Sequence, residues 1–329
     1  MWYPSVRTAL FRLDPERAHQ LALESLRALG RVRSAPLPGD PVDLMGLRFP
    51  NRVGLAAGFD KNAIAVDGLG ALGFGFIEVG TVTPRAQTGQ RRPRIFRLHR
   101  AGALVNRLGF PNEGAAAIAA RLAKRRYRGI VGINLGKNAD TPLSHAAEDY
   151  LTGFRTVRGV ADYITVNVSS PNTVGLRDLQ GPDQLRPLLS RLVVERDAAG
   201  NRYLPILVKI SPDLSQPELA GIAALLLSLR IDGVIATNTT VARSGVFGHI
   251  AAESGGLSGR PLRERAQSTV AALRKLVGAD FPIVGVGGID SPDSAIAMRH
   301  AGADLIQIYT GLVYRGPRLV RGCVRALRD

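Results

Sequence analysis

Cysteine is almost absent from this sequence of 329 residues, which contains only Cys323. A single thiol forms no intrachain disulfide and by itself holds neither an iron–sulfur cluster nor a structural zinc ion. The five histidines are scattered and show neither H-x-x-H nor H-E-x-x-H spacing, so we expect no transition-metal site. Any redox chemistry of this chain must therefore use an organic cofactor.

Long apolar runs are missing as well. No run approaches the roughly 18 to 20 uninterrupted apolar residues that a membrane-spanning helix requires, and the first residues lack the pattern of a signal peptide. Hydrophobic residues still make up 45% of the chain, enough to bury the core of one large domain or two ordinary ones. The sequence predicts a globular protein with the cytoplasm as its default location.

Acidic residues and lysine are both scarce beside arginine. The chain has 43 basic and 27 acidic residues, a net charge of +16, and 38 of the basic residues are arginine. Such an excess suits nucleic acid, an anionic membrane surface or acidic small molecules. The arginines are spread through predicted helices without the interleaved aromatic residues of a base-stacking platform, which favours a solvated basic surface and no nucleic-acid partner.

Short β-rich apolar runs alternate eight times with longer helical stretches from residue 52 onward. The predicted strands are 52–59, 74–82, 129–136, 162–169, 205–211, 233–240, 282–289 and 304–311. This alternation predicts a (β/α)8 TIM barrel rather than a doubly wound sheet. The connection at 83–111 is too long for a simple loop and predicts an excursion over the barrel mouth, and that at 241–259 predicts a lid or phosphate-side loop.

The first 33 residues do not fit this repeat. They predict two helices, at 3–13 and 15–29, followed by a stiff linker, "APLPGDP", at 35–41. We therefore expect a two-helix extension at 1–39 and a barrel domain at 40–329. A basic amphipathic pair can lie on an anionic bilayer or admit a lipophilic molecule between its helices. Periodicity alone equally allows the helices to cap the bottom of the barrel.

Polar residues gather where the predicted strands end, which is where a barrel of this type carries its active site. Only five lysines exist in the chain, yet Lys61, Lys137 and Lys209 all lie at such ends. A compact ammonium is useful where a guanidinium does not fit, although each lysine alone could simply pair with a carboxylate such as that of Asp60. Three lysines that converge on one face weaken this pairing interpretation considerably.

The last two strands are followed by glycine-rich turns. Gly287 and Gly288 precede Ser291, a predicted helix N-cap, and "IYTG" follows the eighth strand. Loops at these two positions form the phosphate site of many barrels, so they predict a phosphorylated ligand. Side-chain amides also lie at strand ends or in the excursion over the mouth: Asn106, Asn134, Asn167, Asn172 and Asn238. An amide both donates and accepts hydrogen bonds, which suits a pyrimidine or isoalloxazine ring. Each asparagine alone could equally be an ordinary turn former.

Seven ordered motifs carry a family resemblance. They are "GLAAGFDKN", "NRLGF", "NVSSPNT", "TNTT", "GGLSGRPL", "GVGGIDS" and "QIYTG". Together they closely resemble the signatures of class 2 dihydroorotate dehydrogenases, the quinone-dependent FMN enzymes of pyrimidine synthesis, and the likeness extends to the opening "YPSVRTALFRLDPERAH". It implies oxidation of (S)-dihydroorotate to orotate, with electrons passing through FMN to a membrane quinone, in the de novo synthesis of UMP.

The resemblance also implies which residues bind each ligand. The implied FMN contacts are Ala57, Gly58, Lys61, Thr81, Asn134, Asn167, Lys209, Thr237, Gly259, Gly288, Tyr309 and Thr310. The implied substrate contacts are Lys61, Asn106, Arg107, Leu108, Gly109, Phe110, Asn167, Asn172, Asn238 and Thr239. Lys61 would meet the orotate carboxylate, and Lys209 would stabilise negative charge on the reduced flavin.

The resemblance implies Ser170 as the group that takes a proton from C5 while hydride leaves C6 for flavin N5. Strand parity places Thr165, Asn167 and Ser169 on one side, and Pro171 then breaks the alternation. Strand parity therefore does not show which of Ser169 and Ser170 accepts the proton. The assignment to Ser170 follows from the family motif.

The resemblance further implies that the N-terminal helices form the quinone tunnel and a peripheral contact with the cytoplasmic face of the cell membrane. His19 and Arg97 would be polar anchors for the quinone head. The alternative enzyme is a tRNA dihydrouridine synthase, another FMN barrel, which the charge of +16 would suit. Its chemistry needs a cysteine acid in the barrel mouth, whereas Cys323 lies in the predicted final helix. A basic binding module without catalysis gives no reason for a phosphate site and polar strand ends together.

Overall fold

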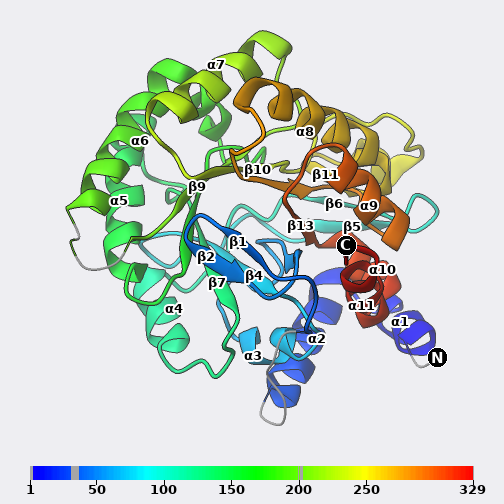
Figure 1. The fold of residues 1–329 in the computed structure, drawn as a ribbon. Helices are drawn as coiled ribbons and strands as arrows, with labels where there is room; N and C mark the ends of the chain where they lie inside the picture. Colours follow the sequence, from blue (N-terminus) through cyan, green and yellow to red (C-terminus); the bar gives the residue numbers. More distant parts are fainter. Residues whose placement is uncertain (1–2, 31–36, 199, 201–202, 329) are drawn as a thin grey trace.

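Eight parallel strands close into a barrel, as the eightfold alternation predicts (Figure 1). The computed structural model describes residues 3–30, 37–198, 200 and 203–328. Around the barrel the order is β10-β12-β13-β3-β4-β7-β8-β9, closing on β10. The strands are β3 (Val53–Leu55), β4 (Phe76–Val82), β7 (Ile130–Leu135), β8 (Tyr163–Asn167), β9 (Ile206–Ile210), β10 (Gly233–Ala236), β12 (Ile283–Val286) and β13 (Leu305–Ile308).

Every residue of these eight strands is buried. Helices cover the outer face and side chains fill the inside, which explains the nearly continuous apolar runs of the sequence. Most strands end one to four residues before their predicted limits, because the polar residues there leave the ladder. Those residues become the loops of the barrel mouth.

The helices that follow the strands pack around the outside of the barrel (Figure 1). They are α3 (Val66–Gly70), α4 (Ala115–Leu122), α5 (Ala146–Val157), α6 (Pro182–Asp197), α7 (Gln216–Ser228), α8 (Arg263–Val277), α9 (Pro292–His300), α10 (Thr310–Arg315) and α11 (Pro317–Ala326). In α6, Leu185, Leu189 and Leu192 are fully buried. Their spacing of four and three residues puts them on one face, and burying each contributes about 2 kcal/mol. The predicted cap of α9 is confirmed, since the Ser291 side chain accepts the N–H of Ser294.

The two long connections meet in one sheet above the barrel. The first forms a hairpin of β5 (Ile95–Leu98) and β6 (Ala103–Asn106), and the second contributes β11 (Gly256–Gly259). These three strands pair antiparallel in the order β11-β6-β5, which we call the mouth sheet. The predicted excursion over the mouth is thus confirmed, and its register places Asn106 opposite Gly256.

The opposite end of the barrel is closed by another hairpin, β1 (Val42–Leu44) and β2 (Leu47–Phe49). The ring of Phe49 packs edge to face on Phe76 with centroids 5.3 Å apart, which seals the barrel interior. The sequence did not predict these two short strands. Residues 35 and 36, where the predicted linker begins, lie outside the described residues.

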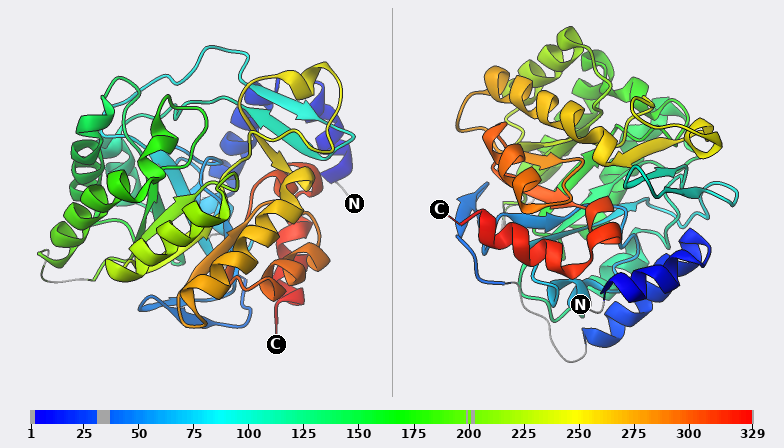
Figure 2. Two further views of the ribbon diagram at one scale, coloured as in Figure 1. Left: turned by 90° about the horizontal axis from the view of Figure 1, so that it is seen from above. Right: turned by 90° about the vertical axis from the view of Figure 1, so that its right-hand side faces the viewer.

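The predicted N-terminal helices are α1 (Tyr3–Phe11) and α2 (Pro15–Leu29). Figure 2 shows them at the mouth end, away from the β1–β2 hairpin. Helix α1 contacts α10, where the Tyr3 hydroxyl donates to the Val313 carbonyl at 2.7 Å, and α2 contacts α3 and β5. The alternative that these helices cap the barrel bottom is therefore wrong. Within the described ranges, no helix combines the length and apolarity that crossing a membrane requires.

Candidate active site

A cavity of about 1080 Å³ opens at the carboxyl ends of the barrel strands, beneath the mouth sheet. It is lined by all of the predicted cofactor residues except one: Ala57, Gly58, Lys61, Thr81, Asn167, Lys209, Thr237, Gly259, Gly288, Tyr309 and Thr310. It is also lined by the predicted substrate residues Asn106, Leu108, Gly109, Phe110, Asn172, Asn238 and Thr239, and by Ser170. The fold thus brings together side chains that are up to 253 positions apart, from Ala57 to Thr310.

Asn134 and Arg107 do not line this cavity. Asn134 is fully buried behind it, and its Oδ1 accepts from Thr81 Oγ1 at 2.6 Å and from Asn167 Nδ2 at 3.1 Å. Arg107 donates to Glu253 at 2.6 Å and stacks over the Phe96 ring. Both residues therefore hold neighbours of the cavity in place instead of facing it.

A buried carboxylate that the sequence analysis did not single out anchors the amide network. Glu78 in β4 accepts hydrogen bonds from Asn134 Nδ2 at 2.8 Å, Gln307 Nε2 at 2.7 Å and the Tyr163 hydroxyl at 3.0 Å. Three donors satisfy a charge that would otherwise be costly to bury. The available signal was a single acid within the apolar run "FIEVGTV".

Two of the three strand-end lysines face the cavity. Lys61 donates to the Gly58 carbonyl at 2.6 Å, and burial lowers its pKa to about 8 although Glu16 opposes the shift. Burial also lowers the pKa of Lys209, whose ammonium has no hydrogen-bond partner among the described residues. Lys137 turns away and donates to the carbonyls of Asn138 and Thr141.

The anticipated pairing of a lysine with Asp60 does not occur as a hydrogen bond in the described part of the chain. The Asp60 carboxylate accepts the N–H groups of Ile64 and Ala65, at 2.9 and 2.7 Å, and so organises its own loop. As far as the structure describes the chain, the cavity lining contains Lys61 and Lys209 but no aspartate, glutamate or histidine. This wall carries one buried and one half-buried lysine without a carboxylate beside them, which suits an anionic ligand.

The two serines after β8 have different surroundings. Ser169 is fully buried, donates to Asn167 Oδ1 at 3.2 Å and accepts from Asn238 Nδ2 at 2.9 Å. Ser170 lines the cavity, and among the described residues its Oγ makes a single hydrogen bond, accepting the N–H of Asn172 at 3.3 Å. The hydroxyl of Ser170 is therefore available to a ligand, a distinction that strand parity does not make.

The cavity also fits a flat polar ring and a phosphate. Two buried polar atoms, Gln307 Oε1 and Asn172 Oδ1, have no hydrogen-bond partner in the described part of the chain, and both residues line the cavity. At the other end, Gly288 has φ +69°, and a Cβ there would lie 2.5 Å from the Arg263 backbone. Only glycine permits this close approach of backbone, as phosphate-binding turns require. In the described ranges no cluster of His, Cys, Asp or Glu could hold a metal ion.

A second cavity, of about 860 Å³, lies between α2 and the loops of the mouth. His19 lines it, with Nε2 2.7 Å from the Phe59 carbonyl oxygen. That oxygen only accepts, so Nε2 carries the proton and Nδ1 does not. Burial and the Lys61 charge lower the pKa of His19 to about 4. Both cavities are lined by Lys61, Ile95, Leu108 and Tyr309.

Arg97 does not line the second cavity. Its guanidinium donates to the Leu13 carbonyl at 2.8 Å and lies over the Phe11 ring. The arginines that do line it are Arg92 and Arg94, which pair with Glu16 of α2. Sequence reasoning missed this ion-pair cluster because its partners are more than 70 residues apart.

Comparison with known proteins identifies the family. The family model described as "Dihydroorotate dehydrogenase" matches residues 41–329. The chain belongs to the dihydroorotate dehydrogenase family. Among curated dihydroorotate dehydrogenases, one named "Dihydroorotate dehydrogenase (quinone)" from Aromatoleum aromaticum is 51% identical, over 100% of this chain and 96% of the relative. Another of the same name, from Cellvibrio japonicus, is 51% identical over 97% of this chain and 96% of the relative.

Solved dihydroorotate dehydrogenase structures share the fold. The ligand-free enzyme of Eimeria tenella superposes with a TM-score of 0.88 at 38% identity, covering 94% of this chain and 93% of that one. A complex of the Eimeria tenella enzyme with ferulenol gives the same TM-score at 36% identity, covering 94% of this chain and 90% of that one. The resemblance inferred from seven motifs is thus confirmed, and nothing supports the tRNA dihydrouridine synthase alternative.

Proposed function

We propose that this protein oxidises dihydroorotate to orotate with a quinone as electron acceptor, a step of pyrimidine biosynthesis. The observation that carries the proposal is a strand-end cavity, in a chain of this family, whose described lining has two lysines, no carboxylate and a ring of amides. Dihydroorotate and orotate are carboxylic acids whose rings alternate N–H and C=O groups, which lysine and asparagine recognise.

The family is flavin-dependent, and we propose FMN as the flavin of this chain. Gly259, Gly288, Tyr309 and Thr310 would hold its phosphate. Ala57, Gly58, Lys61, Thr81, Asn167, Lys209 and Thr237 would surround its ring, with Asn134 orienting Thr81 and Asn167 from behind. When bound, FMN would accept hydride from dihydroorotate and deliver the electrons to the quinone. The ammonium of Lys209, which makes no hydrogen bond with the described residues, would stabilise negative charge on the reduced flavin.

The substrate would lie between the flavin site and the mouth sheet. Lys61 would bind its carboxylate, and Asn106, Asn167, Asn172, Asn238 and Thr239 would bind its amide edges. Leu108, Gly109 and Phe110 would cover its face, and Arg107 would hold this segment through Glu253. Ser170 would accept the C5 proton, because its hydroxyl faces the cavity while that of Ser169 is engaged.

We also propose the second cavity as the quinone site. His19 would present its unprotonated Nδ1, an acceptor that suits a hydroquinone hydroxyl. Arg97 would act from outside the cavity, by fixing the end of α1 through the Leu13 carbonyl. In this proposal the segment 1–39 is the quinone and membrane segment, peripheral to the cytoplasmic face of the membrane, and 40–329 is the catalytic domain.

The decisive experiment is anaerobic bleaching of the purified protein. We expect a yellow protein whose flavin absorbance is lost when dihydroorotate is added and recovers when a quinone is added. Fumarate and NAD should not restore the absorbance. A colourless protein that does not take up FMN, or a flavin that dihydroorotate leaves oxidised, would overturn the proposal.

A further inference from the structure

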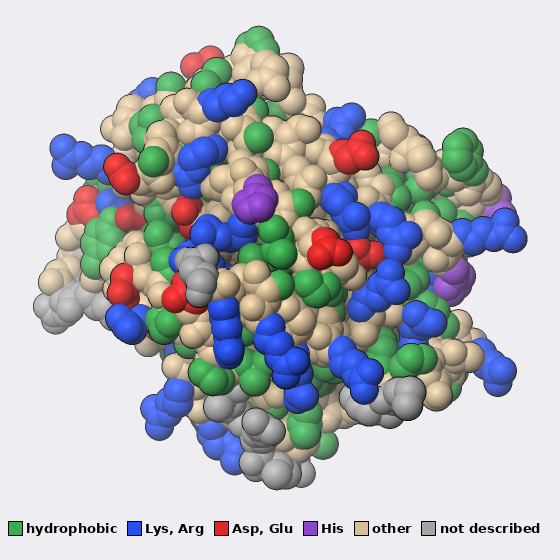
Figure 3. Space-filling model, turned by 45° about the vertical axis from the view of Figure 1, so that its right-hand side comes forward, with side chains coloured by type: hydrophobic (Ala, Val, Ile, Leu, Met, Phe, Trp, Pro, Cys, Tyr) green, Lys and Arg blue, Asp and Glu red, His purple; other side chains and the backbone are tan. Residues whose placement is uncertain are grey.

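A third cavity, of about 510 Å³, opens on the outer surface between α1, the β5–β6 turn and α10. Four arginines line it, each from a different segment: Arg7 from α1, Arg100 from the turn, Arg260 after β11 and Arg315 from α10. We call this cavity the basic pocket. Figure 3 turns its side of the molecule toward the viewer, and many more basic than acidic side chains are visible on that face.

The charges of the basic pocket are not balanced within it. Its only carboxylate among the described lining residues is Asp290, which pairs with Arg260 at 3.0 Å and Arg315 at 3.6 Å, and also with Arg263 outside the lining. Arg7 donates to a neutral carbonyl, that of Tyr314, at 3.0 Å. Arg100 is exposed and makes no hydrogen bond or ion pair with the described residues. Four guanidinium groups against one carboxylate leave a local excess that an anion would neutralise.

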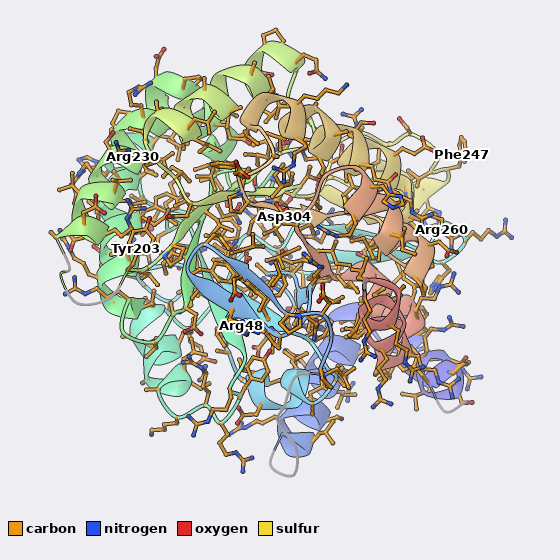
Figure 4. The ribbon with its side chains drawn as sticks, in the orientation of Figure 1. Arg48, Tyr203, Arg230, Phe247, Arg260 and Asp304 are labelled. Atoms are coloured by element: carbon orange, nitrogen blue, oxygen red, sulfur yellow. The ribbon has the colours of Figure 1, made fainter. Side chains whose placement is uncertain are left out.

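Three of the four arginines of the basic pocket, Arg100, Arg260 and Arg315, are exposed to solvent on the outer surface. The backbone of Gly259, Gly288 and Gly311 lines both the basic pocket and the active-site cavity and so separates them. The side chains of Arg260 and Arg315 are 49% and 51% exposed. Figure 4 places Arg260 at the periphery, well apart from Arg48 on the β1–β2 hairpin. The ligand of this pocket must therefore arrive from the surface.

The position of α1 indicates where such an anion would come from. The sequence of α1, "YPSVRTALF", contains no acid, and its Val6 is 40% exposed beside Arg7. A helix with an exposed apolar residue next to a cation is suited to the interface of a bilayer, where anionic headgroups lie. Guanidinium groups also bind phosphate oxygens in a planar, two-point geometry.

We propose that the basic pocket binds the phosphate of an anionic phospholipid headgroup, at the edge of the bilayer contact that we propose for α1 and α2. The inference rests on that proposed contact for its orientation. The observation that supports the pocket independently is its four arginines, which face a single carboxylate among the described lining residues. The lipid would orient the molecule so that the second cavity faces the acyl chains from which a quinone enters.

Vesicle binding tests the proposal. The probes are phosphatidylcholine vesicles and vesicles of phosphatidylcholine mixed with phosphatidylglycerol, compared by sedimentation with the flavin-loaded protein. We expect Arg100→Ala and Arg315→Ala each to reduce binding to the mixed vesicles about fivefold, from the usual contribution of one basic residue near an anionic surface. Binding to phosphatidylcholine alone should not change. Arg48→Ala is the matched control, because it removes an equal charge whose side chain is 71% exposed at the far end of the barrel.

Three results would overturn the proposal. An equal loss in the Arg48→Ala control would mean that total charge, not the pocket, attracts the membrane. Loss of bound flavin in the pocket variants would make the arginines part of the cofactor site. The third result combines two observations: inorganic phosphate protects the wild type but not the variants from thermal unfolding, and the wild type does not prefer vesicles that contain phosphatidylglycerol. This combination would indicate a site for free phosphate. Failure of the wild type to bind phosphatidylcholine would instead count against the α1–α2 contact, and a remaining preference for phosphatidylglycerol would still support the pocket.

Discussion

Ser170 is the residue whose replacement most directly separates binding from chemistry. Ser170→Ala leaves the proposed flavin contacts intact, so we expect a protein that remains yellow. Flavin reduction by dihydroorotate should slow about 10²- to 10⁴-fold, the range of a lost general base. Anaerobic stopped-flow absorbance measures this rate.

Ser169→Ala is the control for that experiment. It removes hydrogen bonds to Asn167 and Asn238, which contribute about 1 kcal/mol each, so the reduction rate should fall by about thirtyfold or less. Reduction of the Ser170 variant at the wild-type rate would remove Ser170 from the proposed role.

Lys61 should impose a pH limit on substrate capture. Its pKa is lowered to about 8, so the free protein loses this positive charge as the pH rises through that value. Because the substrate carboxylate needs the cation, we expect kcat/KM for dihydroorotate to fall about tenfold per pH unit above about pH 8. Lys61→Met should have a low kcat/KM that does not decrease further above about pH 8. If the same decrease persists in this variant, another group must cause it.

His19 should make the fold sensitive to acid. Its folded pKa is lowered to about 4 from an ordinary 6.5, so the unfolded chain binds the proton more tightly in this interval. Stability is therefore lost as the pH falls from about 6.5 toward 4, with about 2 kcal/mol lost between about pH 7 and about pH 5. Urea unfolding at the two pH values measures the loss, and His19→Gln should lose less. An equal loss in that variant would contradict the assignment.

Residue type and position predicted much of the site at this scale. Lysines in an arginine-rich chain and asparagines at strand ends located six residues of the cavity wall, and the family resemblance supplied the other predicted lining residues. The direction of Lys137, the role of Asn134 behind the wall and the carboxylate of Glu78 depend on which neighbours the fold supplies. Those neighbours lie on other strands, and a single sequence does not pair them.

At the scale of elements, the ion pairs of Glu16 join helix α2 to the segment that precedes β5. Arg94 is only 6% exposed and donates to Glu16 at 2.6 Å, and it also donates to the carbonyls of Thr88 and Gln90. Gln90 in turn donates its N–H to the Leu108 carbonyl at 2.9 Å. The N-terminal helix is thus connected to the wall that both cavities share.

Glu16→Gln should therefore destabilise the protein and disturb this wall. The variant leaves the Arg94 charge buried without its carboxylate, which costs about 3 kcal/mol. We expect a lower melting temperature and a slower reaction with quinone, with a smaller effect on flavin reduction by dihydroorotate. Glu24→Gln, on an exposed position of the same helix, is the control and should change neither quantity. Equal behaviour of the two variants would show that the ion pair has no such role.

The mouth sheet was the element least accessible to prediction. Its strands are four residues each, and β6 pairs with β11 across 150 residues, as Asn106 and Gly256 illustrate. Such short strands lack enough alternation to stand out, and their pairing depends on a barrel that must already be closed. Loop length alone indicated that these segments cross the mouth.

At the scale of the whole molecule, the cofactor should contribute to stability. A ligand that binds only the folded state adds about 2.7 kcal/mol at a hundredfold excess over its Kd, so FMN should raise the melting temperature by on the order of 5 °C. Riboflavin, which lacks the phosphate, should raise it less if Gly259, Gly288 and Thr310 hold that group. Calorimetry of the flavin-stripped protein with each compound measures the difference. Equal shifts would place the phosphate outside the proposed turn.

The barrel itself was the most predictable feature of this chain. Eight apolar runs with polar ends specify eight buried strands, because parallel strands covered on both faces leave no solvent-facing positions. Element limits were less accurate, since the sequence does not say where a strand leaves the ladder to become a loop. The β1–β2 hairpin was missed because three residues are too few to form a pattern.

The wall formed by Lys61, Ile95, Leu108 and Tyr309 limits how this protein can evade an inhibitor. A compound that fills the second cavity would touch side chains that also line the first. An escape mutation in that wall would alter turnover of the natural substrate, whereas one at Gln20, which lines only the second of the two cavities, would leave the first cavity's lining unchanged. Resistance should therefore arise more slowly against compounds that mainly contact the shared wall than against compounds that mainly contact residues lining the second cavity alone.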